Sequence, residues 1–345
     1  MRFGLFYEWP NPTLRQWKTL FEEGVEQLQY SEALGFDYCL IAEHPFTTYG
    51  NSPAPLLQAL YIGQRTRHLK IGTAAVILPV WQPLRLAEEV AVLDNLIDGR
   101  FLCGIGRGYQ PYEMAGFGVN VAESRPVTIF PKPLQRPYPP LLLMGTSVDS
   151  MQVAAQLDML PFSSAMMGMD GVRAQFGALV HAHAALDKPL TNLRLGLQCM
   201  THVAPTDEEA AEALRYVRWQ MRAQRGLNRQ EVRNGRVDAS PYPNELDDKS
   251  LMDRLFFGSP ETVIAKLKRA ASVGVTHISN WMMFGGIEHE KLMRSIRLMG
   301  EEVVPALRDV QPPAELPAQL LDESVITNEE LQASRLGRAP RDIAT

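Results

Sequence analysis

The feature that most constrains the fold of this chain is an alternation of short apolar runs with helix-periodic stretches along most of its length. After the run at 2–7, for example, Leu14, Trp17, Phe21 and Val25 recur at spacings of three and four, which is one face of a helix. Such alternation favours parallel βα units over a sandwich or a helical bundle. The expected strands lie at 2–7, 36–42, 69–75, 101–105, 141–144, 159–162, 193–203 and 277–281. Eight strands, with a helix after nearly every one, predict an α/β fold of the (β/α)8 TIM-barrel type.

The composition of the chain indicates which kinds of molecule it is expected to bind. The chain has 345 residues, 46% of them apolar, and 34 basic against 39 acidic residues give a formal charge of −5. This mild negative charge argues against a nucleic-acid binder or a binder of anionic membranes and favours small-molecule partners. No stretch reaches the about 20 apolar residues of a membrane helix, and the N-terminus lacks a secretory layout, so we expect a cytoplasmic protein. The three cysteines, an odd number far apart in apolar runs, are expected to be buried thiols rather than disulfide or metal ligands (Cys39, Cys103 and Cys199).

Two segments interrupt the barrel pattern. Asn228 to Asp253 is polar and contains two prolines, so it is expected to be a long insertion in the seventh βα unit, of the lid-like kind that covers a site. Gln311 to Thr345 has four prolines and no aromatic residue, and is expected to be an extended surface arm with at most one short helix. We therefore divide the chain into a barrel domain at 1–309 and a C-terminal tail at 310–345.

A third anomaly concerns the fourth crossover. Residues Gly106 to Pro140 are rich in proline and glycine and show no helical stripe, so this crossover is expected to lack its helix. Either the crossover is shortened, with 123–126 as one continuous path, or a segment is missing and the chain breaks between Arg125 and Pro126. A shortened crossover would leave an apolar patch for a subunit partner to cover, which fits our expectation of a homodimer or higher homo-oligomer.

The residues just after each strand are the candidates for chemistry, because a barrel's active site lies at the carboxyl ends of its strands. His44 is the only histidine expected at such a place with a neighbouring carboxylate, that of Glu43. It is our candidate catalytic residue. A hydrogen-bonded structural histidine is the competing interpretation.

An anion site is indicated after the fifth strand. In the segment 145–150, which joins this strand to a helix, Thr146, Ser147 and Ser150 place hydroxyls beside the backbone N–H groups of the helix start. Arg107, at the end of the neighbouring strand, could supply a guanidinium for a phosphate. The same hydroxyls could also be simple helix caps that need no ligand, so both interpretations stay open.

Other motifs are weaker. The chain has neither a Gly-x-Ser-x-Gly elbow nor a His-Glu-x-x-His pair, so neither a serine hydrolase nor a helical zinc site is signalled, and no metal is expected. The glycines of 104–108 mimic a dinucleotide-binding fingerprint, but Pro111 and Gly116 stand where its helix would begin. Seven arginines at helical spacing could form an RNA-binding stripe, but the acidic run 207–212 favours a solvated or subunit-contact face (Arg215, Arg218, Arg222, Arg225, Arg229, Arg233 and Arg236).

Several of these segments, in this order, resemble the bacterial luciferase-like superfamily of flavin-dependent monooxygenases. The likeness runs from Met1 to about Asp309. Its carriers are Arg2-Phe3-Gly4-Leu5-Phe6, Gly35-Phe36-Asp37 with Ala42-Glu43-His44, Ile71-Gly72-Thr73-Ala74-Ala75-Val76, Gly99-Arg100-Phe101 with Gly104-Ile105-Gly106-Arg107-Gly108, Phe130-Pro131-Lys132-Pro133-Leu134-Gln135, Gly258-Ser259-Pro260-Glu261 and Glu301-Glu302-Val303-Val304-Pro305.

The resemblance implies a specific chemistry. Members of this superfamily are barrels that bind reduced FMN, delivered by a separate NAD(P)H-dependent flavin reductase, and let it react with O2 to give a flavin C4a-hydroperoxide. The implied substrate is small and apolar, such as an aldehyde, a ketone or a terpene-like compound. Pro45 stands where many relatives carry a second histidine, which leaves the substrate type open.

The resemblance also implies residue roles. His44 matches the active-site histidine, Arg107 the phosphate-binding arginine, and Ser147 and Ser150 the phosphate-binding hydroxyls. The pair Ala74 and Ala75 matches a non-proline cis peptide beneath the flavin ring. Relatives also carry a helix-bearing segment after the match to Arg125 that closes over the flavin, so we favour the chain break over the shortened crossover.

Two alternatives stay open. A barrel of this fold could use a deazaflavin for hydride transfer without oxygen. It could also be a flavin-binding protein without turnover, since a barrel that lacks a helix resembles the truncated member of the superfamily.

Overall fold

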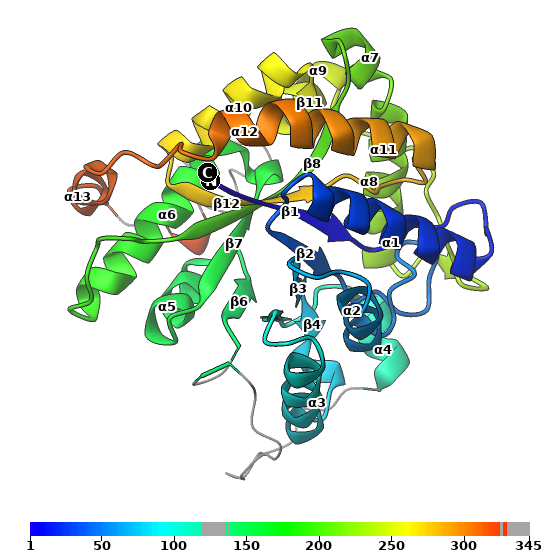
Figure 1. Cartoon of the computed structure of the whole chain (residues 1–345), viewed down its shortest axis with the longest axis horizontal. Helices are drawn as coiled ribbons and strands as arrows, with labels where there is room; N and C mark the ends of the chain where they lie inside the picture. Colours follow the sequence, from blue (N-terminus) through cyan, green and yellow to red (C-terminus); the bar gives the residue numbers. More distant parts are fainter. Residues whose placement is uncertain (119–134, 137–138, 325–326, 330–345) are drawn as a thin grey trace.

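The computed structural model describes residues 1–118, 135–136, 139–324 and 327–329. Within them, eight parallel strands close into a barrel that is surrounded by helices (Figure 1). The strands are β1 (Arg2–Tyr7), β2 (Tyr38–Ile41), β3 (Lys70–Thr73), β5 (Phe101–Gly106), β6 (Leu141–Met144), β7 (Leu160–Ser164), β8 (Leu195–Val203) and β12 (Val275–Trp281). The predicted TIM barrel is therefore confirmed.

The remaining elements follow the strands or decorate them. Short strands β4 (Val76–Ile77) and β11 (Phe256–Gly258) pair with β5 and β8, and β9 (Val232–Arg233) and β10 (Arg236–Val237) form a separate hairpin. The helices are α1 (Trp17–Ala33), α2 (Pro55–Gly63), η1 (Leu78–Val80), α3 (Pro83–Leu96), α4 (Pro111–Phe117), α5 (Val148–Gln156), η2 (Ala165–Met167), α6 (Gly168–Ala185), α7 (Asp207–Ala211), α8 (Leu214–Asn228), α9 (Asp248–Arg254), α10 (Pro260–Ser272), α11 (His289–Leu298), η3 (Met299–Val303), α12 (Val304–Leu307) and α13 (Leu316–Leu321).

The barrel closes through β12, which pairs with β1 on one side and with β8 on the other. β1 pairs with both β2 and β12, and β8 pairs with both β7 and β12, all of them parallel. Because side chains alternate along a strand, one set fills the barrel and the other packs against the helices. The interior set includes Phe6, Tyr38, Leu40, Leu142 and Phe162. This packed interior leaves the carboxyl ends of the strands as the place for a site.

Helix ends follow the local sequence. The side chain of Ser147 accepts a hydrogen bond from the N–H of Ser150 and caps α5, and Ser259 caps α10 in the same way. Gly99 and Gly274 have φ of 70° and 104° after α3 and α10, as expected of left-handed helix stops. All three cysteines are buried free thiols, as predicted.

The segment after β5 differs from expectation. Residues Pro111 to Phe117 form the short helix α4, where the sequence had predicted no helix. Pro111 stands in the first turn, where its missing N–H costs no hydrogen bond, and Gly118 ends the helix with φ of 61°. The prediction that the prolines exclude a helix here is therefore wrong. The predicted break or continuous path at Arg125 and Pro126 lies outside the described residues.

The predicted insertion separates α8 from β11 and folds back over the barrel mouth. It contains the hairpin β9–β10 and helix α9. The N–H of Thr48, in the loop after β2, donates to the carbonyl of Gly235 in the hairpin turn at 3.1 Å. The insertion therefore contacts the loop that carries His44.

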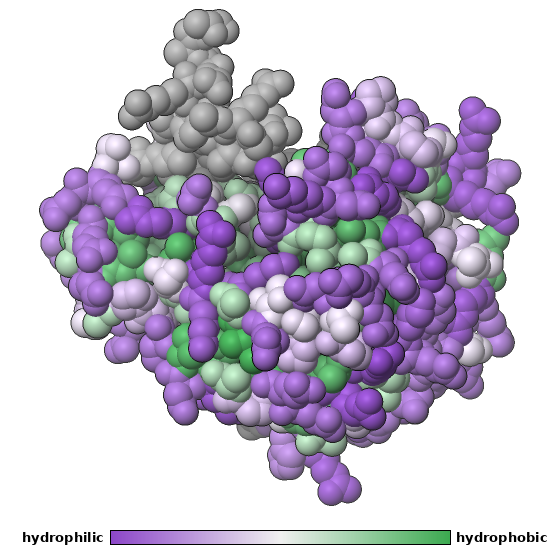
Figure 2. All heavy atoms as spheres, turned by 90° about the horizontal axis from the view of Figure 1, so that it is seen from above, coloured by the Kyte–Doolittle hydropathy of each residue, from purple (hydrophilic) through white to green (hydrophobic). Residues whose placement is uncertain are grey.

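The described part of the tail contains one short helix, α13. It lies against α6 in Figure 1, with Leu316 and Leu320 buried. On the face seen from above, hydrophilic side chains predominate and apolar ones gather only in small separate groups (Figure 2). Within the described residues, no helix is long and apolar enough to cross a membrane.

Candidate active site

His44 lies just after β2 at the barrel mouth and is buried. Its Nδ1 lies 2.8 Å from Oε1 of Glu113, which projects from α4. Its Nε2 lies 3.5 Å from Oε2 of Glu8, which follows β1. Both ring nitrogens therefore face a carboxyl group, and both carboxyls are 1% exposed.

A ring of neighbours holds this group in place. The amide of Gln220 on α8 donates to Oε1 of Glu8 and accepts from the N–H of Gly285 at 2.8 Å. The ring of Tyr49 packs edge-on against the imidazole, with ring centroids 4.8 Å apart. A Cβ on Gly50 would lie 2.9 Å from the Cβ of His44, so a glycine is needed there for the loop to pass.

Burial and charge shift the pKa values of the group. Burial lowers the pKa of His44, but the charge of the Glu113 carboxylate and its hydrogen bond to the ring outweigh this effect, so the net shift is upward. Burial also raises the pKa of Glu8 to about 8, against the opposing effect of His44. Glu8 therefore carries its proton at neutral pH, while Glu113 accepts the Nδ1 hydrogen bond.

Glu43 is not the partner of His44, contrary to the sequence-based interpretation. Its carboxylate accepts hydrogen bonds from the N–H of Ile77 at 2.7 Å and from Nε1 of Trp81 at 2.9 Å. Adjacent residues in an extended segment point to opposite sides, so a neighbour in sequence is a poor candidate for contact. Burial raises the pKa of Glu43 despite these donors.

Sequence reasoning missed three residues of this group. Glu113 was missed because no helix was expected at α4. Gln220 was missed because the only pattern noted in its helix was the spacing of the arginines. Glu8 stood among the residues after the first strand but carried no assigned role. The only available signal was the position of Glu8 at a strand's carboxyl end.

The predicted cis peptide is present between Ala74 and Ala75. It follows β3, next to a close approach of Thr73 and Gly104, where a Cβ on Gly104 would lie 1.8 Å from the Thr73 carbonyl oxygen. The Thr73 hydroxyl donates to the Gly104 carbonyl at 2.7 Å. Gly104, the first glycine of the mimicked dinucleotide fingerprint, thus serves strand packing. The role of the two alanines beneath a flavin stays a prediction.

The candidate anion site lies at the start of α5. The hydroxyls of Ser147 and Ser150 are 2.8 Å apart, and a Cβ on Gly145 would lie 2.4 Å from Oγ of Ser150. Gln175 on α6 donates to the backbone carbonyl of Thr146 at 2.6 Å and fixes this turn. The structure therefore places Thr146, Ser147 and Ser150 at one helix start, where Ser147 also caps the helix, and their role in holding a phosphate stays a prediction.

Arg107 stands on the neighbouring strand end, since β5 and β6 pair. Its side chain is exposed and makes no ion pair with any residue that the structure describes. A guanidinium, three hydroxyls and helix-start N–H groups on adjacent strand ends form a donor set that suits a phosphate. These residues therefore fit the phosphate group of FMN.

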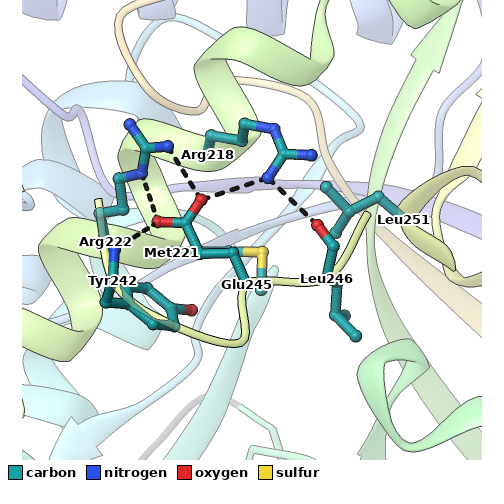
Figure 3. A pocket seen from close by; sticks show the side chains of 7 residues that line it. All are labelled: Arg218, Met221, Arg222, Tyr242, Glu245, Leu246 and Leu251. Carbon is teal, nitrogen blue, oxygen red and sulfur yellow. Dashed lines mark hydrogen bonds and ion pairs between the residues drawn. The ribbon is translucent and has the colours of Figure 1, made fainter. Parts of the chain in front are cut away.

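Two arginines of the predicted stripe, both on α8, form ion pairs within the protein. Arg218 and Arg222 both bind Glu245 of the insertion, at 3.2 Å and 2.7 Å (Figure 3). These contacts hold the pKa of Glu245 down at about 2, chiefly through Arg222. The expectation of a fully solvated or subunit-contact face was therefore wrong for these two residues, which clamp the insertion onto the helix that carries Gln220.

The chain is similar in sequence and in fold to several known proteins. A relative from Acinetobacter baylyi, the oxygenase component of a flavin-dependent trigonelline monooxygenase, is 23% identical over 90% of this chain and 96% of its own length. The monooxygenase RslO1 from Streptomyces bottropensis has a similar structure, with a TM-score of 0.77 at 23% identity over 88% of this chain and 99% of that one.

Two further structures bear on the cofactor. The oxygenating constituent of 3,6-diketocamphane monooxygenase from Pseudomonas putida, in complex with FMN, aligns with a TM-score of 0.74 at 20% identity, over 90% of this chain and 99% of that one. The coenzyme F420 dependent tetrahydromethanopterin reductase of Methanopyrus kandleri aligns with a TM-score of 0.65 at 15% identity, over 88% of this chain and 98% of that one.

The family of luciferase-like monooxygenases matches residues 1–129 and 123–277, which is most of the chain. The order of motifs in the sequence predicted this membership. The chain belongs to the luciferase-like monooxygenase family and is an enzyme of the monooxygenase type.

Proposed function

We propose that this protein is the oxygenase component of a two-component monooxygenase that uses reduced FMN and O2 to oxidise a small apolar substrate. The observation that carries the proposal is the buried pair of His44 and Glu113, with Glu8 opposite, at a barrel mouth that also holds an unpaired arginine within the described residues. An acid–base group and a phosphate-type donor set at the same end of one barrel are what a flavin-dependent oxygenation needs.

The chain's own residues have separate tasks in this proposal. Arg107, Thr146, Ser147 and Ser150 hold the phosphate of FMN, and Ala74 and Ala75 support its ring. His44 gives or takes a proton at the reacting centre. Bound reduced FMN supplies the reaction with oxygen, and the burial of His44 and Glu113 keeps water away from them.

Aromatic side chains at this mouth support an apolar substrate. The rings of Phe46, after β2, and Phe117, on α4, lie 4.9 Å apart and both are half exposed. They stand next to the elements that carry His44 and Glu113. A substrate that enters here meets hydrocarbon surface first.

The proposal has a direct test. The purified protein is mixed with chemically reduced FMN under argon, then with air, and the reoxidation rate of the flavin is followed in stopped flow. Slow reoxidation relative to free reduced FMN, and product from an aldehyde or ketone panel when an NAD(P)H-dependent flavin reductase is added, would support it. Reoxidation as fast as that of free flavin together with no oxygenated product would overturn it.

A deazaflavin enzyme is the second candidate, because a fold neighbour is an F420-dependent reductase. That reaction transfers a hydride and needs no oxygen. Reduction of a deazaflavin by an alcohol panel under argon, with no oxygen-dependent product from FMN, would favour it.

We also propose that the protein forms a homodimer or higher homo-oligomer, and that the chain divides at residue 309 into a barrel domain and a tail. Sedimentation measures the first. Limited proteolysis that leaves a stable product ending near residue 309 would support the second.

A further inference from the structure

Glu8 stands opposite the ring nitrogen of His44 that Glu113 leaves unbound. Glu113, as a carboxylate, can only accept a hydrogen bond, so Nδ1 of His44 carries the proton of their 2.8 Å contact. In the neutral ring, Nε2 then has a free lone pair. Oε2 of Glu8 lies 3.5 Å from this nitrogen.

The surroundings of Glu8 favour a protonated carboxyl. Glu8 is 1% exposed, and no described arginine or lysine pairs with it. Its hydrogen-bond donor is the neutral amide of Gln220, whose carbonyl oxygen is already used by the N–H of Gly285. The charged and titratable groups that face this cluster come from several elements (His44, Glu43, Tyr49, Tyr109 and Glu113). Of these, only His44 can be a cation.

We propose that Glu8 is a positioning residue whose carboxyl proton is available for transfer to Nε2 of His44. When the imidazole has given its Nε2 proton to a bound substrate or cofactor, the O–H bond of Glu8 breaks and an N–H bond forms at Nε2. Glu8 is left as a carboxylate and regains its proton from water before the next turnover. The 3.5 Å separation is longer than a strong N–H···O bond, so the ring is not locked to Glu8 and can face the site.

The upward shift of the pKa of Glu8 to about 8 agrees with this role. A donor whose pKa lies near the working pH loses and regains its proton readily. An ordinary glutamate would be ionised and would have no proton to give at neutral pH.

The test compares Glu8→Gln, which keeps the shape and the hydrogen bond to Gln220, with Glu43→Gln, which removes a buried carboxyl that bonds to Ile77 and Trp81 instead of the ring. Infrared difference spectra of the protein without cofactor should show one protonated carboxyl at pH 7 that disappears in Glu8→Gln and persists in Glu43→Gln. Nitrogen NMR of labelled histidine should show a larger change in the titration of His44 in Glu8→Gln than in Glu43→Gln.

The kinetic arm uses the pH profile. In the wild type, activity should decline as the pH rises through about 8, while Glu8→Gln should be about tenfold slower and lack that decline. A Glu8→Gln protein with wild-type rate and pH profile, or without the loss of the carboxyl band, overturns the proposal. The inference rests on the proposed role of His44. The infrared and NMR spectra of Glu8→Gln could change as expected while His44→Ala keeps full turnover. In that case the proposed function fails, and the contact between Glu8 and His44 is structural.

A second inference comes from the C-terminal segment, which returns to the candidate phosphate site. Arg173 of α6 forms a two-bonded ion pair with Glu323, at 2.5 Å and 2.6 Å, and holds this segment near α5. Oδ1 of Asn328 accepts a hydrogen bond from the N–H of Val148 at 2.8 Å, and its Nδ2 donates to Asp149 at 3.2 Å. Val148 is the first residue of α5, so its N–H is one of those that a phosphate would use.

We infer that Asn328 is a neutral occupant of the phosphate site and that FMN binding displaces it. This inference rests on the proposed function. A phosphate oxygen carries a charge, so it makes the stronger hydrogen bond to the same N–H. The cost of releasing Asn328 lowers the affinity for FMN and couples cofactor binding to movement of the tail.

Two substitutions at Asn328 should act in opposite directions. Asn328→Ala removes the competing acceptor and should tighten FMN binding about threefold or more, whereas Asn328→Asp keeps an acceptor, adds negative charge and should weaken binding. Riboflavin, which lacks the phosphate, should bind all three proteins equally. Hydrogen exchange at 316–324 should rise on addition of FMN and not of riboflavin.

Weaker FMN binding by Asn328→Ala would mean that Asn328 helps to hold the phosphate and would overturn the inference, as would no change in either variant. If FMN and riboflavin bind the wild type and Arg107→Ala equally, the phosphate site itself is wrong and the proposed function is at fault.

Discussion

The carboxylate of Glu113 accepts a 2.8 Å hydrogen bond from Nδ1 of His44, although 69 residues separate the two in sequence. The pair exists because the loop after β2 and the helix α4 after β5 meet at the same end of the barrel. It fixes the tautomer of the imidazole and directs Nε2 away from Glu113. The residues that hold and orient the ring of His44 are therefore as much a part of this site as His44 itself.

Glu113→Gln should lower turnover about ten- to a hundredfold. The amide cannot stabilise the imidazolium as a carboxylate does, and hydrogen bonds to charged groups contribute about 1.5–3 kcal/mol. The pKa of His44 should fall in the same variant, since Glu113 is the group that raises it most. Histidine NMR and steady-state kinetics measure both effects. An unchanged titration of His44 would contradict the pairing.

His44→Ala should keep FMN binding and lose about a hundredfold or more in turnover, as is typical when a general acid or base is removed. Flavin fluorescence titration and kinetics separate the two effects. Loss of FMN binding with a normal circular dichroism spectrum would instead assign His44 a cofactor-binding role.

Arg107→Ala should weaken FMN about tenfold or more, because one charge-assisted contact to the phosphate is lost. The affinity for riboflavin should stay the same. Arg85→Ala is the matched control, since Arg85 is an exposed arginine that pairs with Glu89 on its own helix. Equal FMN affinity in Arg107→Ala and the wild type would refute the phosphate assignment.

The stability of the protein should depend on pH through Glu8. Its pKa rises from 4.5 to about 8 on folding, so the folded state binds this proton more tightly than the unfolded chain. The resulting stabilisation is full below about pH 4.5 and is lost as the pH rises through about 8. The free energy of unfolding of the wild type, relative to Glu8→Gln, should therefore fall across this range in urea titrations. A difference that does not change with pH would show that Glu8 titrates normally.

Glu245→Ala should loosen the insertion. Two arginines of α8 lose their shared partner, which should lower the free energy of unfolding by about 1 kcal/mol or more. Proteolysis within 229–254 should become faster. Glu231→Ala, at an exposed position of the same insertion, is the control. Cleavage at the wild-type rate would mean that the remaining contacts hold the insertion, namely the ion pair of Arg218 with Asp248 and the apolar cluster of Tyr49, Ala223 and Leu227.

The sequence by itself determined the barrel pattern, because the period of apolar residues is local information: runs such as 2–7 and 101–105 favour strands, and stripes such as that of α1 favour helices. It also determined the candidate phosphate residues, since Thr146, Ser147 and Ser150 lie within one turn. It misjudged α4, where proline in a first turn is compatible with a helix.

Only the tertiary structure decided which groups surround His44. The sequence pointed to Glu43 because it is adjacent, but the extended backbone turns that side chain toward Ile77 and Trp81. Glu8, Glu113 and Gln220 come from three distant elements, and their contacts depend on how the barrel closes. The upward shift of the pKa of Glu8 follows from burial at that junction, a property of the packed chain that no local pattern of residues contains.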